Sequence, residues 1–166
     1  TSSNNTTLLE RRTTYAWLAG VTQVLTPNSI IQSNLFYQNA DGYLSDQYKY
    51  FDHRPSSRDE YGWVVRYNHY IESLDAALHA DYRLLMDSWD MASHTVQVKW
   101  YQPLGESVIL RPQVRFYTQN KAEYFSSEFP PTDFEAIYSA DQRLSGFGGL
   151  SYGAKLEISL GDSFTL

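Results

Sequence analysis

Cysteine is absent from the sequence, which excludes disulfide bonds, thiolate catalysis and cysteine-ligated metal centres. No apolar run approaches the roughly 18 residues that a transmembrane helix needs. Charged residues amount to only 19%, the net charge is −6, and no basic tract suggests a nucleic-acid-binding surface. In contrast, aromatic residues reach 16% of the 166 residues and include 14 tyrosines. This composition is atypical of a soluble helical bundle and indicates a single β-rich domain over residues 1–166.

Apolar and polar residues alternate with a period of two along most of the chain. Tyr61, Trp63, Val65 and Tyr67 share one parity, for example, and in a strand such a set faces one side of the sheet. The alternation is regular in five segments and looser in the first two, where Gln23 interrupts the apolar parity. It predicts an all-β chain of seven strands. The expected strands cover about residues 13–25, 30–39, 61–71, 74–85, 92–102, 107–118 and 145–160.

The connections between these strands alternate between short and long. Long connections are expected at about residues 40–60, 87–91 and 119–143, and turns of a few residues join the other strand pairs. This rhythm is typical of a sheet whose turns lie at one rim and whose loops lie at the other. The predicted fold is therefore an antiparallel up-and-down transmembrane β-barrel, with strands near the roughly 9–11 residues that a tilted membrane strand needs.

The long connections are acidic, with twelve acidic and five basic residues. The rest of the chain is nearly balanced, with seven acidic and eight basic residues. Within the five regular strands the apolar parity carries no charge, as contact with lipid demands. The opposite parity carries a ladder of basic residues predicted to face the lumen. Its members are Arg66, Arg83, Lys99, Arg111, Arg115 and Lys155. Such a ladder either favours anions or pairs with carboxylates from elsewhere in the barrel.

Aromatic residues cluster towards the ends of the predicted strands, as in the two girdles that mark membrane interfaces. The residues expected at the lipid interface are Tyr61, Trp63, Tyr82, Trp100, Phe116 and Tyr152. Pro112 departs from the pattern, because a proline in mid-strand removes a ladder hydrogen bond and usually marks a bulge or an edge.

A soluble antiparallel sandwich with one solvated face is the alternative interpretation. It accounts for the alternation of apolar and polar residues. It accounts less well for long loops at one rim, and for strands longer than the five or six residues that are most common. The membrane barrel is therefore the preferred prediction.

Eight short motifs lie between Val24 and Glu157. They are DGYLSD (Asp41–Asp46), RYNHY (Arg66–Tyr70), LHADYR (Leu78–Arg83), DSW (Asp87–Trp89), SHT (Ser93–Thr95), YQPL (Tyr101–Leu104), LRP (Leu110–Pro112) and RLSGFG (Arg143–Gly148). In these stretches the chain resembles the bacterial domain-of-unknown-function 3570 family. The resemblance implies an outer-membrane β-barrel with no assigned activity, and it supplies no catalytic residues. It also places Pro112 inside a family motif.

Members of that family are longer than this chain, and bacterial single-chain barrels have even strand numbers. Seven strands cannot close by themselves, and an unclosed sheet leaves two unpaired edges. The chain is therefore expected to be a segment of a larger barrel.

The histidines are the candidates for chemistry. Ser93 and His94 are adjacent, but adjacent residues on a strand point to opposite faces, which separates a nucleophile from its base. His79 and Asp81 share the parity of Arg83, and a cation beside two potential ligands makes a poor metal site. The sequence therefore predicts no catalytic, cofactor-binding or metal-binding residues and no enzyme activity.

These patterns predict a protein of the outer membrane of a Gram-negative bacterium, surrounded by lipid and lipopolysaccharide, with neither nucleic acid nor a cofactor as a partner. Its expected role is that of a pore or transport component with a mildly basic lumen. A first alternative is a structural or assembly scaffold that binds other envelope proteins through acidic outer loops. A second alternative is a soluble, aromatic-rich binding module with the sandwich fold.

Overall fold

The structure is a computed structural model, which describes residues 10–46, 48–49, 52–128, 132–133 and 136–159. In these residues seven strands form one sheet. The strands are β1 (Arg12–Thr26), β2 (Ser29–Gly42), β3 (Ser57–Ile71), β4 (Ala76–Asp87), β5 (Ala92–Pro103), β6 (Val108–Gln119) and β7 (Phe147–Ile158). Two short 3₁₀ turns, η1 (Glu72–Leu74) and η2 (Gln142–Leu144), lie in the connections. No helix in the described ranges is long and apolar enough to cross a membrane.

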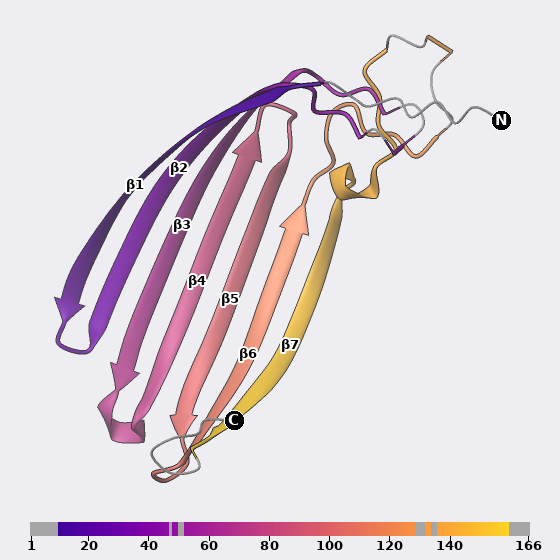
Figure 1. The fold of residues 1–166 in the computed structure, drawn as a ribbon. Coiled ribbons are helices and arrows are strands. Elements are labelled where there is room, and N and C mark those ends of the chain that lie inside the picture. Colours follow the sequence, from indigo (N-terminus) through magenta and orange to yellow (C-terminus); the bar gives the residue numbers. More distant parts are fainter. Residues whose placement is uncertain (1–9, 47, 50–51, 129–131, 134–135, 160–166) are drawn as a thin grey trace.

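Consecutive strands pair antiparallel in the order β1-β2-β3-β4-β5-β6-β7, which confirms the prediction of an all-β, up-and-down chain. Short connections join the strands at one end of the sheet, here called the turn rim. Residues 43–56, 88–91 and 120–146 connect them at the other end, the loop rim, as Figure 1 shows. The described strands make one open sheet, in which β1 and β7 each pair on one side only. They do not form the two packed sheets of a sandwich.

The loop predicted at residues 40–60 is shorter in the structure, because β2 and β3 pair almost to their ends at the loop rim. The charged run Arg58–Glu60 therefore lies in β3 rather than in a loop. Its charges are compensated within the sheet, since Nη2 of Arg58 contacts the Asp87 carboxylate at 2.6 Å. The sequence suggested a loop because it does not show which residues neutralise these charges. In the structure the neighbouring strand β4 supplies a counterion.

The other bounds differ from the predicted ones by a few residues. The strand predicted at 74–85 begins at Ala76, after η1, and the one predicted at 145–160 begins at Phe147; residue 160 lies outside the described ranges. Pro112 causes no bulge, because the β5–β6 register is the same on both sides of it. A register shift occurs instead in β1, between Val24 and Thr26.

The register divides the sheet into two chemically different faces. Directly paired residues share a face, so pairs such as Trp63–Leu84 and Arg66–Asp81 each mark one side of the sheet. The apolar face carries the odd-numbered residues of β1–β3 and the even-numbered residues of β4–β7, and the polar face carries the others. A row is here the set of directly paired residues that crosses the sheet from strand to strand. From the row of Tyr61 to the turn rim, the described part of the apolar face contains no Asp, Glu, Lys or Arg.

Apart from the connections at the loop rim, no described residues form a layer over either face of the sheet. The strands contribute only Ala40 and Ala76 to the buried hydrophobic residues of the described chain. Large apolar side chains stay exposed instead: Trp17 by 74%, Leu150 by 66% and Tyr152 by 86%. The sheet is thus held together by backbone hydrogen bonds between its strands, and nothing in the described residues packs against its apolar face.

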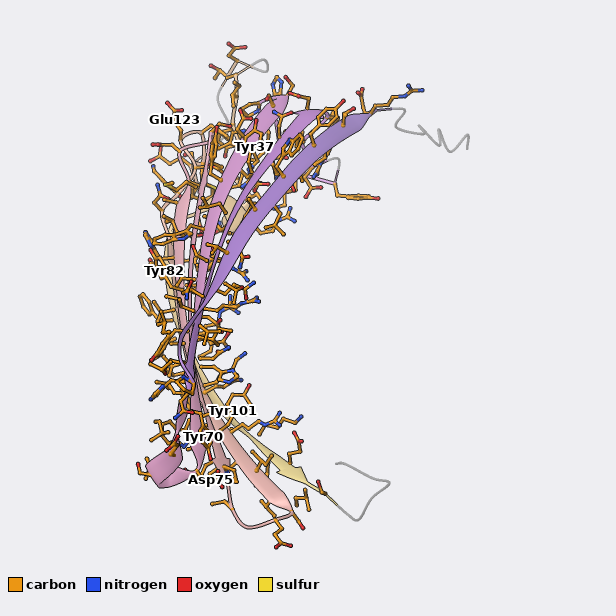
Figure 2. All side chains as sticks on the ribbon, turned by 90° about the vertical axis from the view of Figure 1, so that its left-hand side faces the viewer. Tyr37, Tyr70, Asp75, Tyr82, Tyr101 and Glu123 are labelled. Atoms are coloured by element: carbon orange, nitrogen blue, oxygen red, sulfur yellow. The ribbon has the colours of Figure 1, made fainter. Side chains whose placement is uncertain are left out.

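The sheet is a curved wall, seen nearly edge-on in Figure 2. The side chain of Tyr82 lies on the convex side and that of Tyr101 on the concave side. By the register, Tyr82 belongs to the apolar face and Tyr101 to the polar face. The polar face is therefore the concave one.

Gly62 provides a test of packing on the polar face. A Cβ atom at Gly62 would lie 1.8 Å from Cε1 of the Phe36 ring, whereas a Cβ atom at Gly149 on the same face would have no atom within 4 Å. We expect Gly62→Ala to lower the free energy of unfolding by about 1–3 kcal/mol, because the ring must move. Gly149→Ala is the matched control, with an expected change within about 0.5 kcal/mol.

Urea unfolding midpoints of the refolded variants measure this difference. Replacing Phe36 by alanine in the Gly62→Ala background should recover part of the loss, because the clash is then removed. Equal midpoints for the two glycine variants would show that the Phe36 ring does not lie against the β3 backbone.

Candidate functional site

The polar face carries all six basic residues of the predicted ladder, on strands β3 to β7. Arg66 and Arg115 lie in one row across the sheet, with Asp81 and Gln97 between them. Nε of Arg66 contacts the Asp81 carboxylate at 3.5 Å. Directly paired residues lie on the same face of the sheet, so all four side chains of this row are on the concave side.

Arg83 lies one row nearer the loop rim than this row, and Lys99 lies one row nearer the turn rim. Together with the row of Arg66 and Arg115 they surround a polar hollow of about 190 Å³. The hollow is lined by Val64, Arg66, Asp81, Tyr82, Arg83, Thr95, Gln97, Lys99 and Arg115. Four of these lining residues are basic and one is acidic, so the hollow is electropositive.

The turn-rim end of the ladder is neutralised within the sheet. Arg111 and Lys155 are directly paired on β6 and β7, and both contact the Glu157 carboxylate, at 2.8 and 3.5 Å. The guanidinium of Arg111 also lies over the Tyr101 ring, 4.9 Å from its centroid. The ladder therefore consists of a paired end and an electropositive middle.

The six aromatic residues predicted at the lipid interface all lie on the apolar face. Some of them lie away from the strand ends, since Tyr82 and Phe116 share one row with Val96 in the middle of the strands. Tyr152 also lies in mid-strand, opposite Val114. Parity determines the face of a residue, whereas only the register shows how far it lies from the rim.

Tyr61 and Trp63 lie in the loop-rim half of β3, with Trp63 close to mid-strand, and both line an apolar hollow of about 430 Å³. Trp17, Phe36 and Tyr37 from the first hairpin complete its aromatic lining. The rings of Tyr37 and Tyr61 are 5.2 Å apart, and Nε1 of Trp63 donates to Ser33 Oγ at 2.9 Å. Trp100 lies at the opposite end of the apolar face, in a row with Leu78.

At the loop rim, the connections fold over the polar face. Nε2 of Gln119, a polar-face residue of β6, donates to the backbone carbonyls of Arg143 and Ser145 at 3.0 and 2.6 Å. The Arg58 guanidinium lies over the Trp89 ring, 4.4 Å from its centroid. Trp89 also belongs to the small buried cluster that the loops form with Ala122 and Leu144. A hollow of about 420 Å³ separates these loops from the polar face.

Asp141 holds the two long loops together, and its side chain is only 2% exposed. Its carboxylate contacts Arg143 at 2.5 Å, Lys49 at 2.7 Å and Arg54 at 2.8 Å. Hydrogen bonds from Arg143, Lys49 and Arg54 hold the pKa of the Asp141 carboxyl well below its usual range, against the opposing effect of burial. In the sequence Asp141 is one of twelve loop acids, and no local motif distinguishes it.

His69 and His94 form local hydrogen bonds, and His79 makes a ring contact. Nδ1 of His94 lies 2.8 Å from the Tyr82 hydroxyl on the apolar face, whereas Ser93 points to the polar face. Nδ1 of His69 lies 2.7 Å from Ser29 Oγ at the turn rim. His79 lies against the Tyr101 ring, with centroids 4.4 Å apart. Among the described residues, no group of three or more His, Asp or Glu side chains is placed to hold a metal ion.

A family model described as "Protein of unknown function (DUF3570)" matches residues 2–166. The chain belongs to this family. The match confirms the resemblance seen in the sequence motifs and extends beyond the stretch from Val24 to Glu157 that contains them. Searches of the curated proteins and of the solved structures found no match. For this DUF3570 protein, the geometry of the two faces is therefore the basis for a functional proposal.

Asp141→Asn tests the role of the buried carboxylate in the DUF3570 loop rim. Removing its charge takes one of two carboxylate partners from Arg54, which keeps Asp52 at 2.8 Å, and weakens the contacts to the more exposed Lys49 and Arg143. We expect a loss on the order of 1 kcal/mol in local stability. Amide hydrogen exchange at residues 52–56 and 136–145 measures the opening. Asp90→Asn, an exposed position in the neighbouring connection, is the control. Equal exchange in the two variants would contradict the role of Asp141.

The same contacts predict how the loop rim responds to pH. Because the folded-state pKa of Asp141 is lowered, the stabilisation is fully present above the unfolded pKa of about 3.9 and is lost as the pH falls towards the folded value. We expect hydrogen exchange in the loop rim to be constant from pH 7 to about 5, once corrected for intrinsic rates, and to accelerate below about pH 4. The Asp141→Asn variant should lack this acid-dependent step.

Proposed function

We propose that the sheet is part of the wall of a transmembrane β-barrel in the bacterial outer membrane, and that this barrel acts as a pore or transport component. In this proposal the convex apolar face contacts lipid and the concave polar face lines a water-filled lumen. The loop rim faces outward, next to lipopolysaccharide, and the turn rim faces the periplasm. No catalytic step is part of the proposal.

The observation that carries the proposal is the uncovered apolar face, which is free of charge from the row of Tyr61 to the turn rim. Along β3 this stretch, Tyr61–Ile71, is roughly 33 Å long at about 3.3 Å per residue. A strand tilt of about 40° reduces that length to roughly 25 Å, the height of the apolar band in outer-membrane barrels. A water-exposed sheet would leave the same surface as a large aggregation-prone patch.

The curvature and the loops support the same proposal. A barrel wall must curve with its lumen on the concave side, and the concave face of this sheet is the one that carries the mid-strand charges. Long connections at one rim and short turns at the other are typical of outer-membrane barrels. Lipid contact would also account for the exposure of Trp17 and Tyr152.

Fractionation and heat-modifiable gel mobility of the full-length protein test the proposal. Closed β-barrels stay folded in SDS and change their mobility only when boiled. We expect the protein in urea-washed outer membranes, with a mobility shift between unboiled and boiled samples. Recovery in the soluble fraction without a shift would refute the membrane barrel.

A matched pair of substitutions tests the assignment of the faces. Val64 and Val65 are adjacent on β3, but Val64 lies opposite Arg83 on the polar face and Val65 lies opposite Tyr82 on the apolar face. We expect Val65→Glu to destabilise the membrane-inserted protein by roughly 1–2 kcal/mol, because lipid cannot solvate the carboxylate. Val64→Glu should have little effect, because water and a cation reach that position. Equal losses in the two variants would refute the lipid-facing assignment.

A scaffold that binds other envelope proteins through its loop rim is the second candidate. Exposed acidic residues at this rim, such as Asp90 and Glu123, favour it. It predicts a stable complex after extraction in mild detergent, and loss of that complex in the Asp90→Asn, Glu123→Gln double variant. A barrel that elutes alone, or a complex that the double variant retains, would count against the scaffold.

A further inference from the structure

The cations of this chain differ in whether a carboxylate neutralises them. At the loop rim, Arg54 and Arg58 each contact a carboxylate within 2.8 Å. In the middle of the polar face, Arg83, Lys99 and Arg115 form no ion pair with any residue that the structure describes. These three cations are gathered on three adjacent strands. Arg11, Arg12 and Lys121 also form no ion pair with a described residue, but they lie apart from one another or from this group, at the loop-rim end of the strands.

Arg83, Lys99 and Arg115 form the cation cluster together with Arg66. Neighbouring strands lie about 4.8 Å apart, and successive residues on one face lie about 6.7 Å apart. The register therefore places the four cations within an area of roughly 14 Å on a side, around Asp81 and Gln97. All four line the hollow of about 190 Å³ on the concave face.

The charges in this hollow do not balance. Asp81 is the one carboxylate among its lining residues, and it already contacts Arg66 at 3.5 Å. Like charges on neighbouring strands repel one another and destabilise a sheet. The cluster therefore keeps an excess of positive charge that a bound anion would compensate.

The side chains in the hollow suit an oxyanion. Guanidinium groups pair with phosphate or carboxylate oxygens through two parallel hydrogen bonds, and a lysine adds a mobile point charge. Thr95 and Gln97 add neutral donors to the same lining. Four cations around one carboxylate favour a dianion over a monovalent anion, and the small volume favours a single anionic group over a polymer.

We propose that Arg83, Lys99 and Arg115, with Arg66 positioned by Asp81, form a binding site for a phosphate-type dianion on the polar face. This inference deepens the proposed function, on which it rests for its biological role: it gives the pore a substrate class, namely inorganic phosphate or small phosphorylated solutes. The site itself consists of residues on one wall and is accessible from the concave side.

Equilibrium binding to the folded full-length protein in detergent tests the site without requiring transport. Inorganic phosphate and glucose 6-phosphate are titrated separately by calorimetry in a low-salt buffer, with chloride as the monovalent comparison. We expect saturable phosphate binding that equimolar chloride does not abolish. Tighter binding of the ester would identify a phosphorylated solute as the ligand, and equal or tighter binding of phosphate would identify the free ion.

Single substitutions then locate the site. Lys99→Gln and Arg115→Gln should each weaken phosphate binding by roughly tenfold, the effect of losing one charge-assisted hydrogen bond. Arg115→Lys, which keeps the charge but not the paired donors, should bind with intermediate affinity. Lys121→Gln makes the same change of charge at the exposed loop rim and should bind like the unmodified protein. The heat-dependent mobility shift verifies that each variant is folded.

The outcomes separate this proposal from the pore. Binding that is absent, that chloride abolishes, or that Lys121→Gln weakens as much as Lys99→Gln would refute a specific site and leave only a diffuse positive field. Conductance in planar bilayers without phosphate binding would preserve the pore and refute the site. Phosphate binding by a protein that conducts no ions would preserve the site and refute the pore.

Discussion

The in-register pairing of seven strands is the constraint on which the rest of the structure depends. A slip by one residue between any two strands would move the apolar residues of one strand to the polar face. The short connections at the turn rim restrict such slips, and pairs such as Trp63–Leu84 continue one chemistry from strand to strand. Because the strands keep this register, each face has a single character over the width of the sheet.

A sheet with two such faces cannot build a core by itself, and the described chain has almost none. Its small buried cluster, which contains Trp89, lies in the loops. Polar contacts stabilise the loops instead. Asp141 joins loops that are far apart in the sequence, and Gln119 binds them to the polar face. Stability is thus divided between backbone ladders in the wall and a buried ionic network at the loop rim.

The polar face shows a corresponding division. Ion pairs join Arg58 to Asp87 near the loops and Arg111 to Glu157 near the turns. The middle of this face keeps cations without carboxylate partners among the described residues. Charges that serve only to hold strands together are expected to be paired, so the unpaired middle is where a ligand is expected. The ion-paired cations and the cations without a carboxylate partner lie on the same face of one sheet, so they can be compared directly.

Local sequence patterns were enough to predict the strands, their up-and-down order and the face of each basic residue of the ladder, because a period of two and the length of connections are local properties. Local pattern could not show that Arg58–Glu60 belongs to β3, that Pro112 leaves the register intact or that Tyr82 lies in mid-strand. Those features depend on which residue a neighbouring strand places opposite. The pairing of Asp141, and the lack of a carboxylate partner for Arg115 among the described residues, depend on the folded chain, since charge partners from distant segments meet through register and loop folding.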